Sequence, residues 1–212
     1  MNLLSLLHDG RIFEFLGWII GFLIALSVHE AAHAAAANYL GDPTAKLAGR
    51  VSLNPLKHLD PFGTLMLLFA GFGWGKPVPV NSSNFANPRV GEALTSLAGP
   101  LANFTIALAL AVPHNLLAPS SPAFIFVQNI MFVNIVIMVF NLLPIPPLDG
   151  GGVVVNFLPP KWAESYRRNG PILLFGLIAF DWVFHTGILW GILGRLINIV
   201  FAVVNLSTIF GG

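Results

Sequence analysis

Long apolar runs constrain this chain more than any other feature. Runs suited to a hydrocarbon core of roughly 30 Å, which about 20 helical residues cross, occur at 13–40, 90–112, 123–143, 171–183 and 187–206. Four of them are long enough, and 171–183 is short. Only 9% of the residues are charged, and the mean hydropathy is +0.79. Because lipid cannot satisfy backbone polar groups, the pattern predicts an all-α integral membrane protein with about five to six transmembrane helices.

The composition excludes some kinds of covalent bond and metal site and gives no indication of others. Cysteine is absent, so disulfides and thiolate metal sites cannot form, and a metal must be held by His, Asp or Glu. The net charge of +1, with no basic stripe, gives no indication of nucleic-acid binding. The N-terminus lacks the basic region and cleavage pattern of a signal peptide, so we expect the first span to be retained. Neither a repeat nor a linker is visible, which favours one domain.

The first apolar run contains three ionisable residues in the pattern His29-Glu30-x-x-His33. On a helix, His29 and His33 project from one face about a turn apart, which allows both imidazoles to hold one zinc ion. Glu30 is placed to accept a proton from water and to return it to a leaving amine. A chance match in an alanine-rich helix is the alternative, but ionisable groups inside a span are rare without a task.

A catalytic zinc site usually has three protein ligands, so a third is expected elsewhere. Asp149 stands out because it follows a long apolar run and lies among prolines 144, 146 and 147 and glycines 150–152, which must unwind a helix. Irregular backbone at membrane depth survives where it lines a site or cavity. An interfacial loop is the alternative explanation. The other candidates are His8, His58, His114, His185, Asp42, Asp60, Glu92, Glu164 and Asp181.

These residues resemble the site-2 protease family of intramembrane zinc metalloproteases. The similarity lies in the motif at 29–33, in Ser96-Leu-Ala-Gly-Pro-Leu-Ala-Asn103, and in Asn141-Leu-Leu-Pro-Ile-Pro-Pro-Leu-Asp149-Gly150. The resemblance implies that His29, His33 and Asp149 bind one Zn²⁺. It also implies that Glu30 is the base and that Asn141 contacts the substrate backbone or the oxyanion.

The resemblance also implies an activity and a domain plan. The activity is hydrolysis of peptide bonds within or near transmembrane segments of membrane-protein or peptide substrates, in contact with the lipid bilayer. Residues 1–158 would form the protease core and residues 159–212 the C-terminal helices of the same domain. No stretch is long and polar enough for a PDZ or CBS domain, as in the compact prokaryotic form. A zinc-carrying transporter or channel is the alternative function.

The stretch 61–74 is apolar but too short to span comfortably, so it is predicted to be re-entrant between the first two core helices. The positive charges then gather on one side, at Lys46, Arg50, Lys57, Lys76, Arg89, Lys161, Arg167 and Arg168. The positive-inside rule makes that side cytoplasmic and opens the active site towards it. A prokaryotic plasma membrane is the simplest host.

Three further expectations concern local structure. Residues 48–53 and 76–80 are predicted to be short extended segments, either a substrate-binding edge or a structural hairpin. Asp60 before Pro61 is predicted to be an N-cap. Gly99 and Asn103 are expected to serve helix packing, with Asn103 near Asn141.

Overall fold

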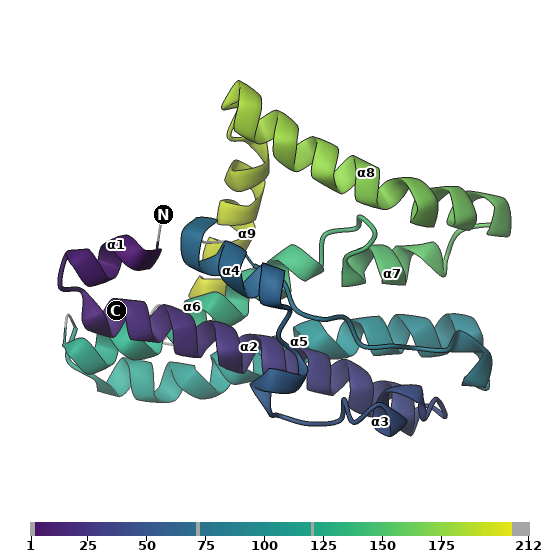
Figure 1. Cartoon of the computed structure of the whole chain (residues 1–212), viewed down its shortest axis with the longest axis horizontal. Helices are drawn as coiled ribbons and strands as arrows, with labels where there is room; N and C mark the ends of the chain where they lie inside the picture. Colours follow the sequence, from purple (N-terminus) through teal and green to yellow (C-terminus); the bar gives the residue numbers. More distant parts are fainter. Residues whose placement is uncertain (1–2, 71–72, 120, 205–212) are drawn as a thin grey trace.

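The computed structural model describes residues 3–70, 73–119 and 121–204, and within these residues it is helical with no named strand (Figure 1). Residues 71–72 of the predicted re-entrant stretch and 205–206 of the last predicted span lie outside the described residues. The helices are α1 (Leu3–His8), α2 (Ile12–Tyr39), α3 (Thr44–Leu47), α4 (Pro61–Ala70), α5 (Pro88–Leu116), α6 (Pro122–Asn141), α7 (Asp149–Val155), α8 (Pro160–Phe184) and α9 (Ile188–Val204), with single 3₁₀ turns at Pro55–Lys57 and Ser82–Asn84.

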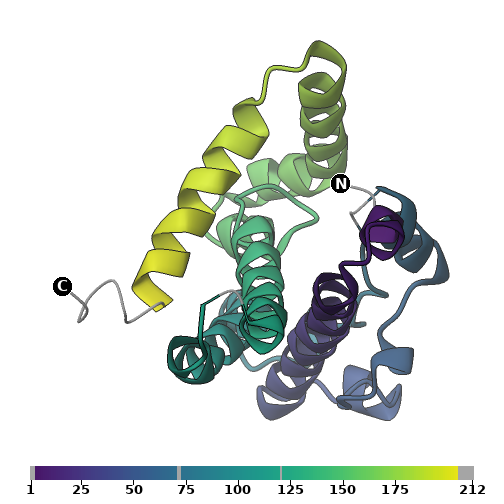
Figure 2. The same cartoon turned by 90° about the vertical axis from the view of Figure 1, so that its left-hand side faces the viewer.

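Three long helices, α2, α5 and α6, pack against one another along one side of the molecule, and α8 lies on the opposite side (Figures 1 and 2). A small residue allows the closest approach: a Cβ atom at Gly21 of α2 would lie 3.0 Å from the Cα atom of Ile130 in α6. Buried apolar side chains of α5, α6 and α9 form the larger core. Lipid offers no hydrophobic drive for helices to associate, so such tight packing is what holds membrane helices together.

The boundaries of α5 and α6 follow from local chemistry. The side chain of Asn87 accepts a hydrogen bond from Val90 N at the start of α5, and Ser121 does the same for Phe124 N at the start of α6. Proline follows each cap at the first helical position. Helix α6 ends at Asn141, before the prolines, and the chain becomes helical again at Asp149. The predicted unwinding of this stretch is confirmed.

The C-terminal region differs from its predicted spans. Helix α8 begins at Pro160, well before the predicted run 171–183, because its polar first half is also helical. Helices α8 and α9 meet at an angle of 106°, and α9 packs against α6. Within the described residues, three helices are long and apolar enough to cross a membrane, or up to four if this bent pair is one span. The all-α membrane class is confirmed, whereas the predicted five to six spans exceed this number.

The stretch between α2 and α5 contains two short helices, α3 and α4, which are joined by turns. Asp60 caps α4 as predicted, since its Oδ1 atom accepts from Gly63 N at 2.8 Å. Helix α4 has 10 residues and is about 15 Å long, too short to cross a bilayer. An isolated antiparallel bridge joins Leu59 to Gly75, and the described part of this stretch contains no named strand. The predicted extended segment 48–53 is wrong at its start, because Ala48 and Gly49 form the turn that ends α3, whereas the segment 76–80 stays a prediction.

A fully buried aspartate, Asp42, fastens the far end of this stretch to the end of α2. Its carboxylate accepts hydrogen bonds from Thr44 N at 3.1 Å, from Asn81 N at 2.7 Å and from the Asn84 side-chain amide at 2.7 Å. Burial alone would raise the pKa of Asp42, but the hydrogen bonds from Thr44, Asn81 and Asn84 outweigh it and lower the pKa to about 2.

Replacing Asp42 by alanine should destabilise the protein, because four donors lose a buried acceptor: the backbone N–H and the hydroxyl of Thr44, Asn81 N and the Asn84 amide. The expected loss is about 1–3 kcal/mol, or roughly 3–10 °C in the melting temperature of the detergent-solubilised protein. Because the folded-state pKa lies below the ordinary value of 3.8, this stability is complete above about pH 4 and is lost as the pH falls through about 2. A difference between wild type and Asp42→Ala that is equal at pH 6 and pH 2 would contradict this account.

Candidate metal centre

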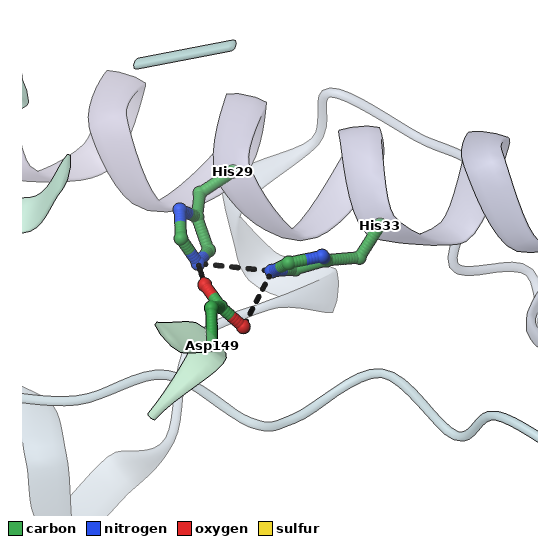
Figure 3. A group of neighbouring side chains, drawn as sticks. All are labelled: His29, His33 and Asp149. Atoms are coloured by element: carbon green, nitrogen blue, oxygen red, sulfur yellow. Dashed lines mark hydrogen bonds and ion pairs between the residues drawn. The ribbon is translucent and has the colours of Figure 1, made fainter. Parts of the chain in front are cut away.

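Three metal-binding side chains converge from two helices that are far apart in the sequence. His29 and His33 project from α2 towards Asp149, the first residue of α7 (Figure 3). The Nε2 atoms of the two histidines lie 3.0 Å apart, and they lie 3.1 and 3.3 Å from the two carboxylate oxygens of Asp149. Both histidines are buried. Among the described residues, these three form the one group that could hold a metal ion.

A chain of amide groups sets the tautomer of His29. The side-chain nitrogen of Asn103 donates to Ala25 O at 2.9 Å and to Asn134 Oδ1 at 3.0 Å. The oxygen of Asn103 therefore accepts from Nδ1 of His29, at 2.7 Å. Asn134 is fixed in turn, because its nitrogen donates to Ile130 O at 2.9 Å. In a neutral imidazole, Nδ1 then carries the proton and Nε2 is left with a lone pair.

A backbone carbonyl performs the same task for His33. Its Nδ1 lies 2.6 Å from Thr95 O, which can only accept a hydrogen bond. Neutral His33 therefore also presents an unprotonated Nε2. Asn103 and Thr95 both belong to α5, so this helix orients both imidazoles by accepting hydrogen bonds from their Nδ1 atoms. Histidines that bind a metal through one ring nitrogen commonly donate a hydrogen bond from the other.

The resulting cluster fits a cation. Two lone pairs and a carboxylate face one another without a proton between them, and Oδ2 of Asp149 is buried with no hydrogen-bond partner among the described residues. Such groups repel unless a positive charge lies between them. In a tetrahedral zinc site with bonds of about 2.0–2.1 Å, neighbouring ligand atoms lie roughly 3.3 Å apart. The distances of 3.0, 3.1 and 3.3 Å agree with this value.

Space for the two imidazoles comes from Gly99 on α5. A Cβ atom at this position would overlap Nε2 of His33 and would lie 2.7 Å from Cε1 of His29. Any side chain here would therefore displace the histidines from the positions that they share with Asp149.

The two remaining predicted site residues differ in their placement. Glu30 is buried beside the histidines, and its carboxylate lies 3.9 Å from a guanidinium nitrogen of Arg50. Asn141 is the last residue of α6, and its amide donates to Ile137 O at 3.0 Å, one turn earlier in its own helix. The role of Asn141 stays a prediction.

The other residues considered as ligands have different partners or positions. Asp42 and Asp60 hold turns, Asp181 accepts from Ile188 N at the start of α9, and Glu92 forms an ion pair with Arg167 at 2.6 Å. His58 and His114 are both buried. None of the alternative candidates belongs to the metal-binding group, namely His8, His58, His114, His185, Asp42, Asp60, Glu92, Glu164 and Asp181.

A cavity of about 240 Å³ lies next to the cluster. It is lined by Thr95, whose carbonyl binds His33, and by Gly152, three residues after Asp149. Arg167 and Glu92 lie on its wall. The cavity is large enough for several water molecules, and residues adjacent to the ligands line it.

Sequence reasoning missed the groups that orient the histidines. Asn103 was expected to pack near Asn141, but it bonds to His29 and to Asn134, two turns earlier in α6. The available signal was an amide in an otherwise apolar span, which needs a partner. Thr95 acts through its backbone carbonyl, so no side-chain pattern could have found it.

Similar proteins are named as zinc metalloproteases. The chain is 41% identical over 176 residues to "Putative zinc metalloprotease YwhC" of Bacillus subtilis, covering 74% of this chain and 78% of that protein. It is 33% identical over 168 residues to "Putative zinc metalloprotease Rip2" of Mycobacterium tuberculosis, covering 76% of this chain and 63% of that protein, less than two thirds of its length.

A more distant archaeal protein carries a similar name. The chain is 26% identical over 106 residues to "Zinc metalloprotease MJ0392" of Methanocaldococcus jannaschii, covering 44% of this chain and 31% of that protein. No family model matches the chain. No solved structure matches it either.

Adding one methyl group at Gly99 tests the geometry of the cluster. Gly99→Ala should weaken zinc binding by about 10-fold or more, because the new Cβ atom displaces both imidazoles. Zinc per chain, measured by elemental analysis after dialysis against a competing chelator, checks this. Gly176→Ala is the matched control, since a Cβ atom there would meet nothing within 4 Å. Equal zinc retention by the two variants would contradict the geometry.

Proposed function

This chain belongs to the site-2 protease family of intramembrane zinc metalloproteases, and we propose that His29, His33 and Asp149 hold its single zinc ion. The observation that carries the assignment of ligands is the convergence of two histidine Nε2 atoms and one carboxylate in a buried position. Its relatives are named as metalloproteases, so the transporter alternative has no observation in its favour.

We propose the following roles in peptide-bond hydrolysis. When bound, zinc supplies Lewis acidity, which makes water more acidic and polarises the scissile carbonyl. Glu30, adjacent to His29 and buried, accepts the proton from water and delivers it to the leaving amine. Asn141 steadies the oxygen of the scissile carbonyl as negative charge develops on it. For this, its amide would turn away from Ile137 O when substrate binds.

The proposed substrates are transmembrane segments of membrane proteins. Peptide bonds in a helix are already hydrogen-bonded within it, so a substrate must be locally extended before attack. We propose that residues 76–80 receive such an extended segment by backbone hydrogen bonding, because prolines 77 and 79 exclude helix there. The contacts of α6 with α9 support treating residues 1–158 and 159–212 as one domain.

Two substitutions separate the proton-transfer role from the ligand role. Glu30→Gln should retain one zinc ion per chain but lose cleavage by roughly 10²–10⁴-fold, whereas His33→Ala should lose both. Zinc content and cleavage of a co-expressed transmembrane reporter check this. Removal of zinc from wild type with a chelator should abolish cleavage, and added Zn²⁺ should restore it. Normal proteolysis by either variant would refute the assignment.

We further propose that the active site opens to the cytoplasmic side of a prokaryotic plasma membrane. Each ligand-bearing helix ends six residues beyond its last ligand, at Tyr39 after His33 and at Val155 after Asp149, or roughly 9 Å along a helix. Most of the positive charge lies in the segments that follow these ends and around α4, and the positive-inside rule places such segments in the cytoplasm. On this orientation, α4 enters the membrane and returns on the same side.

Single cysteines can test this topology, because the natural chain has none. Lys57→Cys and Ser83→Cys lie on either side of α4, and Ala118→Cys lies between α5 and α6. A membrane-impermeant maleimide should label positions 57 and 83 in inside-out vesicles only and position 118 in intact cells. Labelling of 57 and 83 from opposite sides would mean that α4 spans the membrane.

A further inference from the structure

Arg50 is a buried cation next to the active site. Its side chain is buried, with 6% of the residue exposed. In the sequence it is one of several positively charged loop residues. A buried guanidinium is costly unless it is paired and hydrogen-bonded, so its partners indicate its task.

Two of these partners are consecutive backbone carbonyls of the segment proposed to receive substrate. Nη1 of Arg50 donates to Pro77 O at 3.0 Å, and Nη2 donates to Lys76 O. The planar guanidinium suits such paired acceptors, whereas a lysine ammonium would contact them as a single point.

His58 supplies a third partner and is fully buried. Its Nε2 lies 2.6 Å from Ser52 O and must donate to it, so Nδ1 of the neutral ring accepts from Nη2 of Arg50, at 3.4 Å. The backbone of His58 also accepts from Lys76 N, at 2.7 Å. Arg50 and His58 together therefore fix the start of the segment 76–80.

Glu30 supplies the counter-charge. Its Oε2 lies 3.9 Å from Nη2 of Arg50, and among the described residues it is the one carboxylate within ion-pair distance of this arginine. The same guanidinium thus faces the proposed proton acceptor on α2 and holds two carbonyls of residues 76–77. Directly before the segment, a Cβ atom at Gly75 would overlap the side chain of Leu26 in α2.

We propose that Arg50 is a positioning residue that holds the segment 76–80 and the carboxylate of Glu30 in a fixed relation. An extended substrate lying on that segment would then present its peptide bond to Glu30 at a constant distance. This inference rests on the proposed function. A misplacement of about 1 Å can lower an enzymatic rate by 10²-fold, so a group of this kind affects the reaction without touching substrate.

The experiment compares Arg50→Gln and Arg50→Lys with wild type in the full-length, zinc-loaded protein, with fluorescein-labelled casein as an unfolded probe substrate. Arg50→Gln should lower kcat by about 10-fold or more and raise KM, because both the charge near Glu30 and the paired carbonyl contacts are lost. Arg50→Lys should recover much of kcat while KM stays raised, since a lysine restores the charge but cannot hold two carbonyls. Lys57→Gln, an exposed cation on the same loop, is the matched control and should leave both constants unchanged.

Two further measurements do not depend on activity. Zinc per chain should remain at one in both Arg50 variants. Hydrogen exchange of residues 75–80 should become faster in Arg50→Gln and stay unchanged in Lys57→Gln, which tests the hold on the segment even if casein is not cleaved.

The outcomes separate this inference from the proposed function. Wild-type kcat and KM in Arg50→Gln, or unchanged exchange at 75–80, would overturn the positioning role. Loss of zinc or equal loss of activity in both Arg50 variants would overturn it in favour of a purely structural role. Equal, background-level cleavage by wild type and Glu30→Gln would instead count against the proposed function, with the exchange result still deciding the role of Arg50.

Discussion

The interaction on which the site depends is the hydrogen bond between Nδ1 of His29 and the oxygen of Asn103. Its direction follows from the amide nitrogen of Asn103, whose two protons go to Ala25 O and Asn134 Oδ1. An unpaired amide is costly in an apolar interior, so this network joins α2, α5 and α6 at one depth. The helix packing and the tautomer of a metal-binding histidine are therefore fixed by the same bonds.

The third ligand reaches the cluster because α6 stops. Prolines 144 and 146–147 cannot continue a helix, so the chain turns through residues 142–148 and begins α7 at Asp149. A continuous helix would direct positions 141 and 149 along one axis, with no means of bringing a carboxylate back towards α2. The irregular backbone is tolerated where it packs against protein: Pro146 is buried, and a Cβ atom at Gly170 of α8 would lie 2.7 Å from Pro146 O.

How much the sequence predicts differs between parts of the molecule. The central spans and the face shared by His29 and His33 were accessible, because hydropathy reports helices in lipid and a His-Glu-x-x-His pattern fixes two side chains on one face of a helix. The span count was not, since α8 continues through a polar half that hydropathy assigns to a loop. Gly99 and Thr95 could not be predicted as site residues. Gly99 acts by having no side chain, and Thr95 acts through its backbone carbonyl.

Arg50 shows that counting loop charges does not distinguish a buried cation from an exposed one. The positive-inside rule treats every loop cation alike, because insertion depends on charge near the membrane and not on the later contacts of each residue. Lys57 fits that description, since its ammonium reaches Gly49 O at the surface. Arg50, seven residues earlier, is enclosed by His58, the segment at 76–77 and Glu30. A cation that directs topology during insertion can thus become part of the active-site framework. Once it is buried, its charge and its hydrogen bonds also hold neighbouring groups in place.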